Sequence, residues 1–461
     1  MPYNDLREFI QRVEQEGELA HIKAEVDIEY EIGAVCHKAF FSEGDPEKRK
    51  ALIFERPKGY EIPLAVNLLG TRKRMCMALE TTPESFHRDW LERSARPIKP
   101  VIVDWGPCKE NIFVGDEVNL FKFPIPIWNE KDGGPYITLP CWISKDPETG
   151  WRNSGMYRTQ VHDKRTVGLW ASPYRHISMQ WRKAFAKGEG FSVAVAIGCD
   201  PVVTIATVAR AGHGTDEVSL AGGLRGRPVE LVRCETVPLE VPATAEWVLE
   251  GEIKVGALKQ EGPYGEAYGY YGEALPREFM EVKAITHRNN PIHQACYLHR
   301  PPNEASFIRL SDEANIIAQC PVGGVISVNV LDSVTVASIT KTFDGQAKMV
   351  GMGILGSTGG RQAKIMIVVD EDVNPHNLHE VLWAISSRCQ PERDVEILKD
   401  ISSVGIDPSM PEESKRLQTG LSSKMIIDAT KPVRKPFSEA VAPKREVLER
   451  VEREWERYGI T

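Results

Sequence analysis

The chain has 461 residues, of which 42% are hydrophobic and 26% are charged. This length predicts roughly two to four domains, and the composition excludes fibrous and disordered proteins. Its 57 Lys and Arg residues are outnumbered by 65 Asp and Glu residues, which gives a formal net charge of -8. We therefore expect no general electrostatic attraction to nucleic acid or to anionic lipid.

Neither a signal peptide nor a membrane span can be read in the sequence. The start, MPYNDLREFI, has no basic segment followed by an apolar one, and no run of about eighteen apolar residues occurs. A cytoplasmic protein is therefore expected. The nine cysteines form an odd set without a CxxC pair. This pattern argues against a disulfide framework and a thiolate zinc site, and it predicts mostly buried, reduced thiols.

The first expected element is a short amphipathic helix. The segment from Asn4 begins with residues that can cap a helix, and the pattern stops at Gly17. Its apolar positions are Leu6, Phe9, Ile10 and Val13. Strand candidates follow at residues 51–54 and 63–68. We expect residues 1–115 to form an α/β domain.

The middle of the chain has a different residue pattern. Residues 191–197 and 202–208 are apolar runs rich in β-branched side chains, and Gly and Pro turns separate such runs. We expect both runs to be strands. Residues 116–305 are therefore predicted to form a mainly β domain, with a barrel as one arrangement.

The last part, residues 306–461, alternates expected strands and helices. Strands are predicted at 325–330 and 365–370, followed by a helix over 376–388. A terminal amphipathic helix is predicted over 444–458. Its apolar face consists of Val447, Leu448, Val451 and Trp455. Such a helix can dock on its own core or on a second subunit.

The segment GMGILG at residues 351–356 satisfies the dinucleotide-binding pattern GxGxxG. That fingerprint requires a helix directly after the turn, so that the helix N-terminus faces the pyrophosphate. Here residues 357–360, STGG, follow the motif, and a strand is expected a few residues later. We therefore do not interpret the segment as a nicotinamide site.

Three separated residues of the β-rich part are candidate metal ligands. Asn153, His176 and Glu217 offer an amide oxygen, an imidazole nitrogen and a carboxylate. Such a set suits a hard or borderline divalent ion such as Mn²⁺ or Mg²⁺, especially with a cofactor phosphate in the shell. The alternative is that these are ordinary structural side chains.

The segment EGPYGE holds Glu261 and Glu266 five positions apart around a stiff Gly-Pro turn. Rigid loops with carboxylates often carry acid and base groups. A nearby cation such as Arg158 can lower the pKa of one carboxyl while burial raises that of the other. The alternative is a surface turn with two solvated acids.

Together, these segments resemble the UbiD family of reversible decarboxylases. The segment NSGMYR from Asn153 resembles one in which an asparagine binds metal and an arginine, here Arg158, meets the substrate carboxylate. The segment RHI at 175–177 resembles the one that carries a metal-binding histidine. Glu217, in DEVSLAG followed by LRG, matches a metal-binding glutamate.

The resemblance covers essentially the whole chain. Glu261 and Glu266 match the two acids of the family's Glu-Arg-Glu network, and further similarity lies in RPPNE at 300–304 and WAISSR at 383–388. The fold it implies is an α/β, or α+β, multidomain protein. It has an N-terminal α/β domain, a central split β-barrel that binds the flavin, and a C-terminal α/β oligomerisation domain ending in the amphipathic helix.

The resemblance implies prenylated FMN as the cofactor, with Mn²⁺ or another divalent ion such as Mg²⁺. The implied metal ligands are Asn153, His176 and Glu217. The implied cofactor-binding residues are Asn153, Ser154, Gly155, Met156, Tyr157, Arg158, Arg175, His176 and Glu217. Small residues at 206–209 match a stretch that relatives use around phosphate and a monovalent ion, which implies K⁺. Some relatives have Gln at the position of Arg175, and Lys364 is a further phosphate candidate.

The implied activity is the reversible, non-oxidative decarboxylation of an aromatic, heteroaromatic or α,β-unsaturated acid. Loss of CO₂ from an sp² carbon is slow without an electron sink, which the cofactor provides. By resemblance, Arg158 holds the carboxylate, Glu266 protonates the carbon that lost CO₂, and Glu261 holds Arg158 in place. Residues that flank these motifs and can line the substrate pocket are Met156, Tyr157, Tyr264 and Tyr268.

The expected partners are the acid and CO₂, a flavin prenyltransferase that supplies the cofactor, and further copies of the chain in a homodimer or homohexamer. Two alternatives remain open. One is a flavin-dependent oxidoreductase, which has no need of a Glu-Arg-Glu set. The other is a subunit of a multi-component aryl carboxylase or decarboxylase that is active only with its partners.

Overall fold

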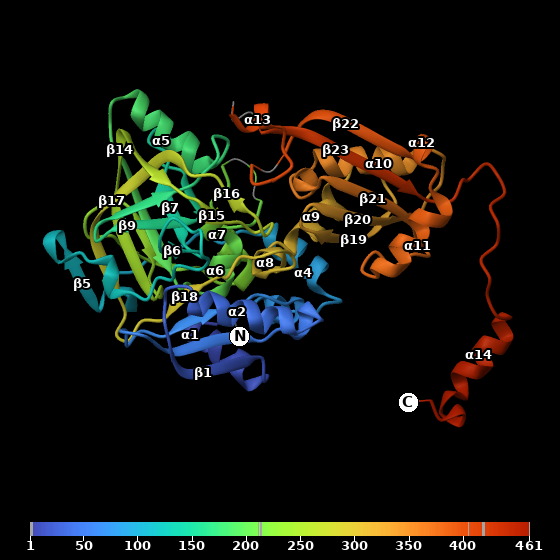
Figure 1. The fold of residues 1–461 in the computed structure, drawn as a ribbon, viewed down its shortest axis with the longest axis horizontal. Helices are drawn as coiled ribbons and strands as arrows, with labels where there is room; N and C mark the ends of the chain where they lie inside the picture. The colour runs from blue at the N-terminus through green and yellow to red at the C-terminus, as the bar shows by residue number, and fades with distance from the viewer. Residues whose placement is uncertain (1–2, 211, 213, 404, 417–419, 461) are drawn as a thin grey trace.

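The computed structural model describes residues 3–210, 212, 214–403, 405–416 and 420–460. Three bodies of secondary structure follow one another along the chain, and a separate terminal arm extends from the last body (Figure 1). The chain is a mixed α/β multidomain protein, as predicted. No helix among the described residues combines the length and apolarity needed to cross a membrane.

The N-terminal body is a four-stranded sheet with helices around it. Its sheet order is β1-β2-β3-β18, in which only the β2–β3 pair is antiparallel. The elements are α1 (Leu6–Gln15), β1 (Leu19–Val26), α2 (Glu31–Ser42), β2 (Ala51–Pro57), β3 (Leu64–Val66), α3 (Arg72–Ala78), α4 (Phe86–Ser94) and β18 (His293–Ala295). Strand β18 comes from much later in the chain, and its pairing with β3 joins the end of the middle body to the N-terminal body.

The predicted first helix is confirmed as α1. Asp5 is its N-cap, because its side chain accepts the backbone N–H of Glu8 at 3.0 Å. The four predicted apolar positions are all buried and pack into the main hydrophobic core. The strand candidates at 51–54 and 63–68 are confirmed as β2 and β3.

The middle body is built on a nine-stranded sheet. Its order is β6-β9-β10-β17-β14-β11-β7-β8, and β5 pairs with β17 outside this path. The strands are β5 (Asn111–Val114), β6 (Tyr136–Ile137), β7 (Cys141–Lys145), β8 (Arg152–Met156), β9 (Thr159–Asp163), β10 (Thr166–Leu169), β11 (Phe191–Ile197), β14 (Trp247–Glu261) and β17 (Leu275–His287). Among the described residues the paired strands form no closed ring, so the split barrel stays a prediction.

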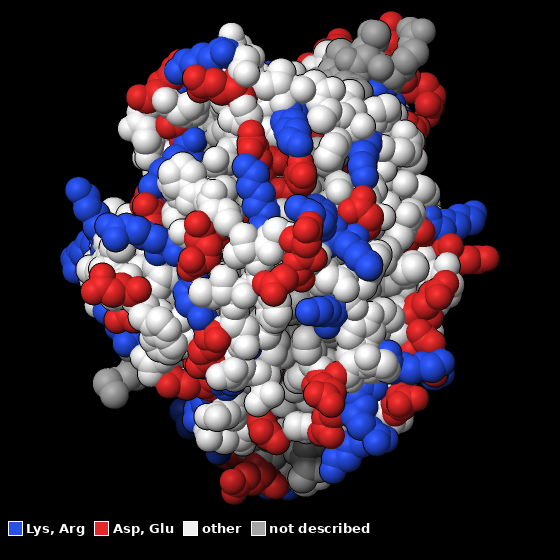
Figure 2. Space-filling model, turned by 90° about the vertical axis from the view of Figure 1, so that its left-hand side faces the viewer, with Lys and Arg blue, Asp and Glu red and all other residues white. Residues whose placement is uncertain are grey.

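Helices and small sheets surround this large sheet. The helices are α5 (His176–Ala186), α6 (Pro201–Ala206) and α7 (Glu217–Arg225). The small sheets are β13-β12-β4, with β4 (Val101–Ile102), β12 (Glu230–Arg233) and β13 (Glu240–Pro242), and the hairpin of β15 (Tyr264–Gly265) and β16 (Tyr271–Gly272). Charged side chains of both signs are interspersed over the face of the molecule in Figure 2.

The expected strand at 202–208 is wrong, because this run forms helix α6 and the residues just after it. Asp200 caps the helix by accepting the backbone N–H of Val202 at 2.7 Å, and Pro201 occupies the first helical position. All six residues of α6 are buried. A short apolar run fits a buried helix as well as a buried strand, so periodicity could not separate them. The run at 191–197 is confirmed as β11.

The C-terminal body is a five-stranded sheet of order β19-β20-β21-β23-β22. Its core has two clusters, one beside α10 and one beside α11, so helices cover both faces. The elements are α8 (Glu304–Ile308), α9 (Ser311–Gln319), β19 (Val325–Leu331), β20 (Val334–Ile339), α10 (Gln346–Gly356), β21 (Ile365–Asp370), α11 (Leu378–Arg388), α12 (Pro391–Asp394), β22 (Val395–Ser402), α13 (Glu412–Arg416), β23 (Leu421–Ala429) and α14 (Arg445–Arg453).

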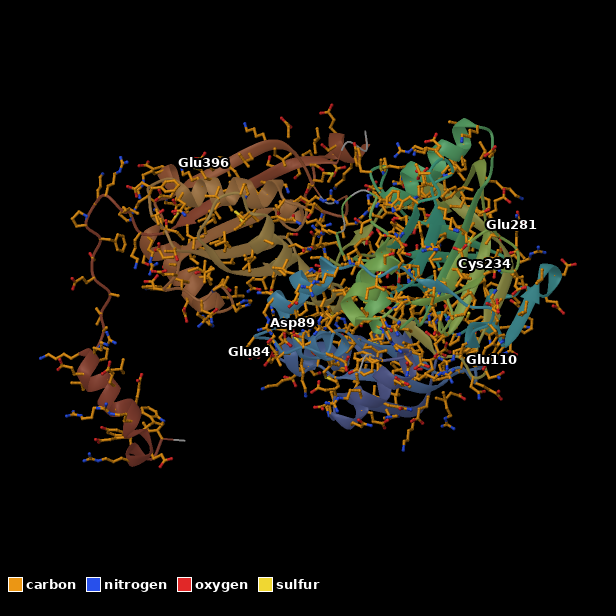
Figure 3. All side chains as sticks on the ribbon, turned by 180° about the vertical axis from the view of Figure 1, so that it is seen from behind. Glu84, Asp89, Glu110, Cys234, Glu281 and Glu396 are labelled. Atoms are coloured by element: carbon orange, nitrogen blue, oxygen red, sulfur yellow. The ribbon has the colours of Figure 1, made fainter. Side chains whose placement is uncertain are left out.

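The predicted strands and helix of this part are confirmed as β19, β21 and α11. The glycines of GMGILG lie inside α10, where Gly351 packs against Ile426. The terminal helix is confirmed as α14, which lies apart from the body at the end of an extended linker (Figure 1). In the view from behind, Glu396 lies on the C-terminal body and Glu281 lies on the middle body (Figure 3). The terminal arm extends beyond the C-terminal body.

The nine cysteines are free thiols, and six of them are buried, as expected for a reduced protein. Burial raises the pKa of several of these thiols, as in Cys108, whose pKa is raised to about 12. These cysteines therefore serve packing rather than chemistry.

Helix α2 and the residues just before it hold the chain segment at residues 127–128. Tyr30 donates its backbone N–H to Ile127 at 2.9 Å, and Ile127 donates to Ile28 at 3.1 Å. A Cβ added to Gly33 would lie 2.0 Å from the carbonyl oxygen of Trp128. Only glycine therefore lets α2 approach this segment.

We expect Gly33→Ala to lower the free energy of unfolding by about 1 to 3 kcal/mol, because the new methyl group forces α2 and residue 128 apart. Denaturant unfolding of the full chain measures this. The matched control is Gly44→Ala, because a Cβ at that exposed loop position meets nothing within 4 Å. Equal midpoints for the two variants would contradict the packing role of Gly33.

Candidate active site

Arg158, Glu261 and Glu266 come together from three places in the middle body, two on its large sheet and one on the small hairpin. Arg158 lies between β8 and β9, Glu261 ends β14, and Glu266 follows β15. The guanidinium makes a bidentate pair with Glu261, through Nε–Oε1 at 2.9 Å and Nη2–Oε2 at 2.6 Å. Its Nη1 donates to Oε1 of Glu266. One cation therefore bridges two carboxyl groups that the sequence placed on one loop.

Hydrogen bonding makes the two carboxyl groups of this set unequal. Both Glu261 and Glu266 are buried, but only Glu261 holds two hydrogen bonds from the guanidinium. Burial raises the pKa of Glu266 to about 7, a rise that Arg158 opposes and the charge of Glu261 reinforces. Burial alone lowers the pKa of Arg158, but Glu266 and Glu261 raise it overall. Arg158 is thus a fixed cation, and Glu266 can carry a proton at neutral pH.

Aromatic rings enclose the guanidinium of Arg158. Its Cζ lies 5.2 Å from the ring centroid of Tyr264 and 5.5 Å from that of Trp170. Tyr136 packs against Tyr264 at 4.2 Å and donates its hydroxyl hydrogen to Glu261 Oε1 at 3.3 Å. These rings exclude water and strengthen the charge interactions inside the set.

The loop that carries Glu266 is held by backbone geometry that requires glycine. Gly262 has a φ of 95° and donates its N–H to Gln160 Oε1 at 2.9 Å. Gly272 of β16 faces the ion pair, because a Cβ there would lie 3.0 Å from Glu266 Oε1. The short hairpin β15–β16 therefore closes over the carboxyl group of Glu266.

The three candidate metal ligands also lie close together. Glu217 is the first residue of α7, and its Oε1 lies 3.9 Å from Nδ1 of His176, the first residue of α5. Its Oε2 accepts the backbone N–H of Ser154 at 2.8 Å, which places the carboxylate beside the residue that follows Asn153. Burial raises the pKa of Glu217 to about 8. A bound cation would favour its ionised form.

The donor set fits a divalent ion. No group of three or more His, Cys, Asp or Glu residues suitable for a metal occurs in the part of the chain that the structure describes. The present set instead combines one imidazole and one carboxylate with the buried amide of Asn153. Nearby, the Ser154 hydroxyl is buried without a hydrogen-bond partner among the described residues, as expected where a ligand supplies one.

The segment between the two sets is shaped by Tyr157. Its ring covers Gly155, where a Cβ would lie 2.5 Å from the hydroxyl oxygen. The hydroxyl hydrogen-bonds the side chain of Asn153, and burial raises its pKa to about 12. Met156 packs beside the main core. The segment from Asn153 to Arg158 thus links the metal-type ligands to the guanidinium.

A cluster of positive side chains lies between the middle and C-terminal bodies, and sequence reasoning named only its first member, Arg175, and missed the other three. The cluster comprises Arg175, Arg210, Arg361 and Lys424. Burial, followed by the charges of Arg210 and Arg361, lowers the pKa of Lys424 to about 8. Burial also lowers the pKa of Arg361, followed by the charge of Arg175. Gathered cations of this kind favour an anion such as phosphate, but no local pattern joins residues from such separate elements.

Two other candidates lie at the same junction. Lys364 places its amine 2.8 Å from Asp407 Oδ2 and also on the hydroxyl of Ser409. The hydroxyl of Tyr268, two residues after Glu266, hydrogen-bonds Ser333 of the C-terminal body. The stretch at 206–209 spans the end of α6 and the residues after it.

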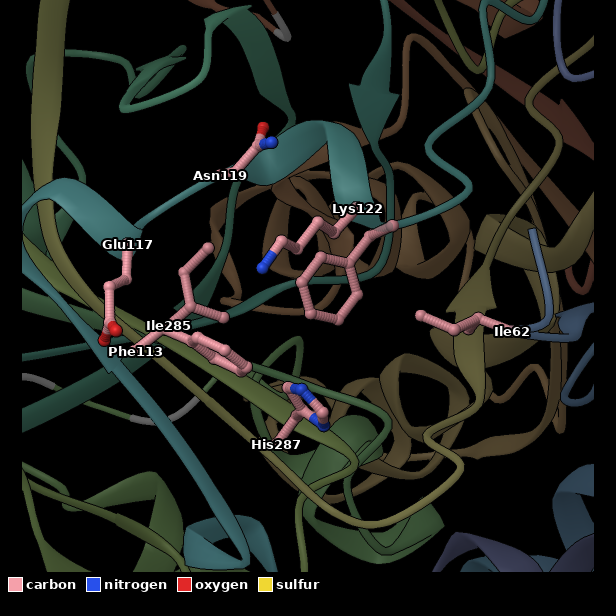
Figure 4. A pocket seen from close by; sticks show the side chains of 8 residues that line it. Ile62, Phe113, Glu117, Asn119, Lys122, Ile285 and His287 are labelled. Atoms are coloured by element: carbon pink, nitrogen blue, oxygen red, sulfur yellow. The ribbon is translucent and has the colours of Figure 1, made fainter. Parts of the chain in front are cut away.

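One surface pocket, of about 200 Å³, lies away from all these residues, at β5 (Figure 4). Lys122 places its amine 4.5 Å from the ring centroid of Phe113, and His287 stacks on the same ring at 5.5 Å. None of the candidate site residues lines it. The candidate active site is therefore recognised by its buried charged residues and not by the volume of a pocket.

Three models of the UbiD family match consecutive parts of the chain. They are described as domains of 3-octaprenyl-4-hydroxybenzoate carboxy-lyase. The N-terminal domain matches residues 10–94, the Rift-related domain residues 100–301, and the C-terminal domain residues 307–429.

Similar proteins cover nearly the whole chain. The phenolic acid decarboxylase of Bacillus subtilis is 34% identical over 454 residues, which span 94% of this chain and 93% of that protein. The UbiD-class enzyme HmfF from Pelotomaculum thermopropionicum in complex with FMN has a TM-score of 0.86 at 34% identity, covering 97% of this chain and 100% of that chain. An evolved dimeric form of HmfF in complex with prFMN has a TM-score of 0.83 at 33% identity, covering 96% and 97%.

A third similar protein is the vanillic acid decarboxylase ShVdcCD of Sedimentibacter hydroxybenzoicus. Its closed form has a TM-score of 0.89 at 32% identity and covers 100% of both chains. Another structure of that decarboxylase contains truncated ShVdcD, with a TM-score of 0.86 at 32% identity over 100% of both chains.

The pKa of Glu266 predicts how stability depends on pH. Because the pKa is raised to about 7, the folded chain holds this proton more tightly than the unfolded chain does. The resulting stabilisation is complete at low pH and is lost as the pH rises through about 7. We expect cofactor-free Glu266→Gln to lose less stability than the wild type between about pH 5 and about pH 8, by on the order of 3 kcal/mol.

Chemical denaturation at the two pH values measures this difference. The matched control is Glu84→Gln, which removes an exposed carboxyl group of the N-terminal body (Figure 3). Equal losses in wild type and Glu266→Gln would show that Glu266 titrates in the ordinary carboxyl range.

Proposed function

The chain belongs to the UbiD family of carboxy-lyases, and we propose that it catalyses the reversible, non-oxidative decarboxylation of an aromatic, heteroaromatic or α,β-unsaturated acid with prenylated FMN. The observation that carries this proposal is the buried set of Arg158, Glu261 and Glu266. A carboxylate-binding cation beside a protonated carboxyl group is what exchange of CO₂ for H⁺ requires.

Prenylated FMN, when bound, supplies the sink for the electron pair that CO₂ leaves behind. Residues from Asn153 to Arg158 with Arg175, His176 and Glu217 would hold it. The unpartnered hydroxyl of Ser154 and the positive cluster around Arg175 support this assignment. The cofactor in HmfF, a relative with the same fold, supports it as well.

Asn153, His176 and Glu217 would hold Mn²⁺, or another divalent ion such as Mg²⁺. The ion would neutralise negative charge between the Glu217 carboxylate and a cofactor phosphate. K⁺ near residues 206–209 is a further proposal by family resemblance. The divisions at residues 1–115, 116–305 and 306–461 are proposed as functional domains.

Arg158 is proposed to bind the substrate carboxylate. Glu261 occupies one edge of the guanidinium with two hydrogen bonds and so fixes its plane. Tyr264 and Trp170 enclose the same group, which keeps water from competing with the substrate. A carboxylate held in this way has its bond to carbon in a set orientation before that bond breaks.

Glu266 is proposed to supply the proton. The C–CO₂⁻ bond breaks heterolytically, CO₂ leaves without the bonding electrons, and the proton of Glu266 takes its place on the carbon. A pKa of about 7 makes the protonated form available at neutral pH. In the carboxylation direction, ionised Glu266 would take the proton back.

Two other functions compete with an autonomous decarboxylase. The structure of the vanillic acid decarboxylase with truncated ShVdcD favours a second candidate, a subunit active only with a partner polypeptide. Assaying this chain alone, after co-expression with a flavin prenyltransferase, separates the two. A flavin-dependent oxidoreductase would leave Glu261 and Glu266 without a role. Among substrates, we favour a water-soluble aromatic or heteroaromatic acid, and we propose a homo-oligomer in the cytoplasm.

We expect Glu266→Gln to lower kcat for CO₂ release by at least about 100-fold, because glutamine cannot donate the proton. The absorption spectrum of the bound cofactor should stay unchanged, because Glu266 lies outside the proposed cofactor-binding set. Screening unsaturated acids for CO₂ release and for deuterium exchange at the reacting carbon measures the effect. Glu84→Gln is the control, and retained activity in cofactor-loaded Glu266→Gln would contradict the assignment.

We expect Glu217→Gln to reduce bound Mn²⁺ from about one ion per chain to less than about half, because the anionic ligand is lost. Elemental analysis of the purified protein, with Glu84→Gln beside it, measures the metal content. Full occupancy in Glu217→Gln would mean that the ion binds elsewhere.

A further inference from the structure

A turn from the middle body lies directly against the segment that carries Glu266. Its residue Asp132 uses both carboxylate oxygens. Oδ1 accepts the backbone N–H of Gly265 at 2.8 Å, and Oδ2 accepts the backbone N–H of Asn129 at 2.9 Å. Gly265 is the residue immediately before Glu266. One carboxylate thus ties the proposed proton donor's own backbone to the turn at 129–132.

Glycines bring the two segments into direct contact. A Cβ on Gly265 would lie 2.7 Å from Nδ2 of Asn129, and a Cβ on Gly133 would lie 2.3 Å from the carbonyl oxygen of Gly262. Gly133 also donates its N–H to the carbonyl of Pro263 at 2.8 Å. No side chain fits between the segments, so the position of the turn fixes the position of the loop.

The turn itself is anchored from the other side. Asn129 Oδ1 accepts the hydroxyl hydrogen of Tyr297 at 3.2 Å, and that hydroxyl lies 3.3 Å from Nδ1 of His37 on α2. Ile127, just before the turn, is tied to the start of α2 by backbone hydrogen bonds. The N-terminal body therefore holds the turn, and the turn holds the loop of Glu266.

Asp132 also acts through its charge. The charged groups that face Glu266 are Arg158, Glu261 and Asp132. Arg158 lowers the pKa of Glu266, whereas Glu261 and Asp132 both raise it after the larger effect of burial. Burial raises the pKa of Asp132 above its ordinary value, although its hydrogen bonds from Gly265 and Asn129 and the charge of Arg158 oppose this rise. Removal of the Asp132 charge therefore favours ionisation of Glu266.

We propose that Asp132 is a positioning residue for the reaction. Its carboxylate fixes the backbone on which Glu266 is mounted, and its negative charge favours the protonated form of Glu266. This inference rests on the proposed role of Glu266 as proton donor. It adds a residue, 26 positions before Arg158, that lies outside the proposed catalytic and cofactor-binding sets.

The test uses Asp132→Asn in the cofactor-loaded full chain. Asparagine keeps an oxygen for the Gly265 N–H but lacks the charge. We expect the alkaline limb of the kcat/KM profile to move to lower pH by on the order of half a unit or more, because that limb reports the free-enzyme proton donor. A purely structural role would lower activity equally at every pH.

A second readout is independent of turnover. The infrared carboxyl band of Glu266, identified by its absence in Glu266→Gln, gives the titration midpoint in cofactor-free protein. Asp132→Asn should shift this midpoint downward by a similar amount. Asp132→Ala, which removes both hydrogen bonds as well, should in addition lower kcat by roughly tenfold.

The matched control is Asp163→Asn. Asp163 likewise accepts a backbone N–H, that of Arg165 at 3.0 Å, but its charge pairs with Lys259. It should leave the profile and the midpoint unchanged. If Glu266→Gln is inactive but Asp132→Asn leaves both readouts at their wild-type values, the role of Asp132 is refuted and the proposed function stands. If cofactor-loaded Glu266→Gln stays active, the assignment of Glu266 as proton donor fails, and the role of Asp132 fails with it; if the cofactor-loaded wild type releases no CO₂ from any acid, the proposed function itself fails.

Discussion

The burial of one guanidinium between two carboxyl groups is the interaction on which this site depends. Arg158 can be enclosed by aromatic rings only because Glu261 satisfies it with two charge-assisted hydrogen bonds. The same cation cannot compensate two buried carboxylates equally, so Glu266 is left to hold a proton at neutral pH. One buried cation between two carboxyl groups thus provides both a group that can bind a carboxylate, Arg158, and a group that can hold a proton, Glu266.

The large sheet of the middle body holds two of the three residues, Glu261 and Arg158, in fixed positions. Glu261 ends the 15-residue strand β14, whose long antiparallel pairing with β17 forms the centre of the sheet. Arg158 lies in the link between β8, at one end of the strand order of the same sheet, and β9, the second strand from the other end. Glu266 alone lies on a short hairpin, and it is held by contacts with the turn at 129–132 instead of by the sheet. The proton donor is therefore the member of the set whose position depends most on tertiary contacts.

The opposite side of the site is assembled from two bodies. Glu217 and His176 begin helices of the middle body, whereas Arg361 and Lys424 belong to the C-terminal body. Arg175 of the middle body acts through its charge on Arg361 of the C-terminal body, so the two bodies bring positive groups together at their junction, an arrangement suited to an anion such as phosphate. Tyr268 links the loop of Glu266 to the same C-terminal body through Ser333. The loop that carries Glu266 and the cluster of positive side chains therefore both contact the C-terminal body.

The sequence by itself determined the local elements and the family. Strong periodicity identified the first helix and strands such as β11, and the motifs from Asn153 to Arg158 and from Glu261 to Glu266 named the site residues. It misread 202–208, because a short apolar run has no period that separates helix from strand. The Glu-Arg-Glu network was implied by the family resemblance alone, and the tertiary structure decided how Arg158 meets Glu266, 108 positions away, and that Asp132 holds the backbone that carries Glu266. Periodicity reports neighbours within a turn or a strand, whereas burial, charge pairing and the resulting pKa values arise from chain segments that meet only after folding.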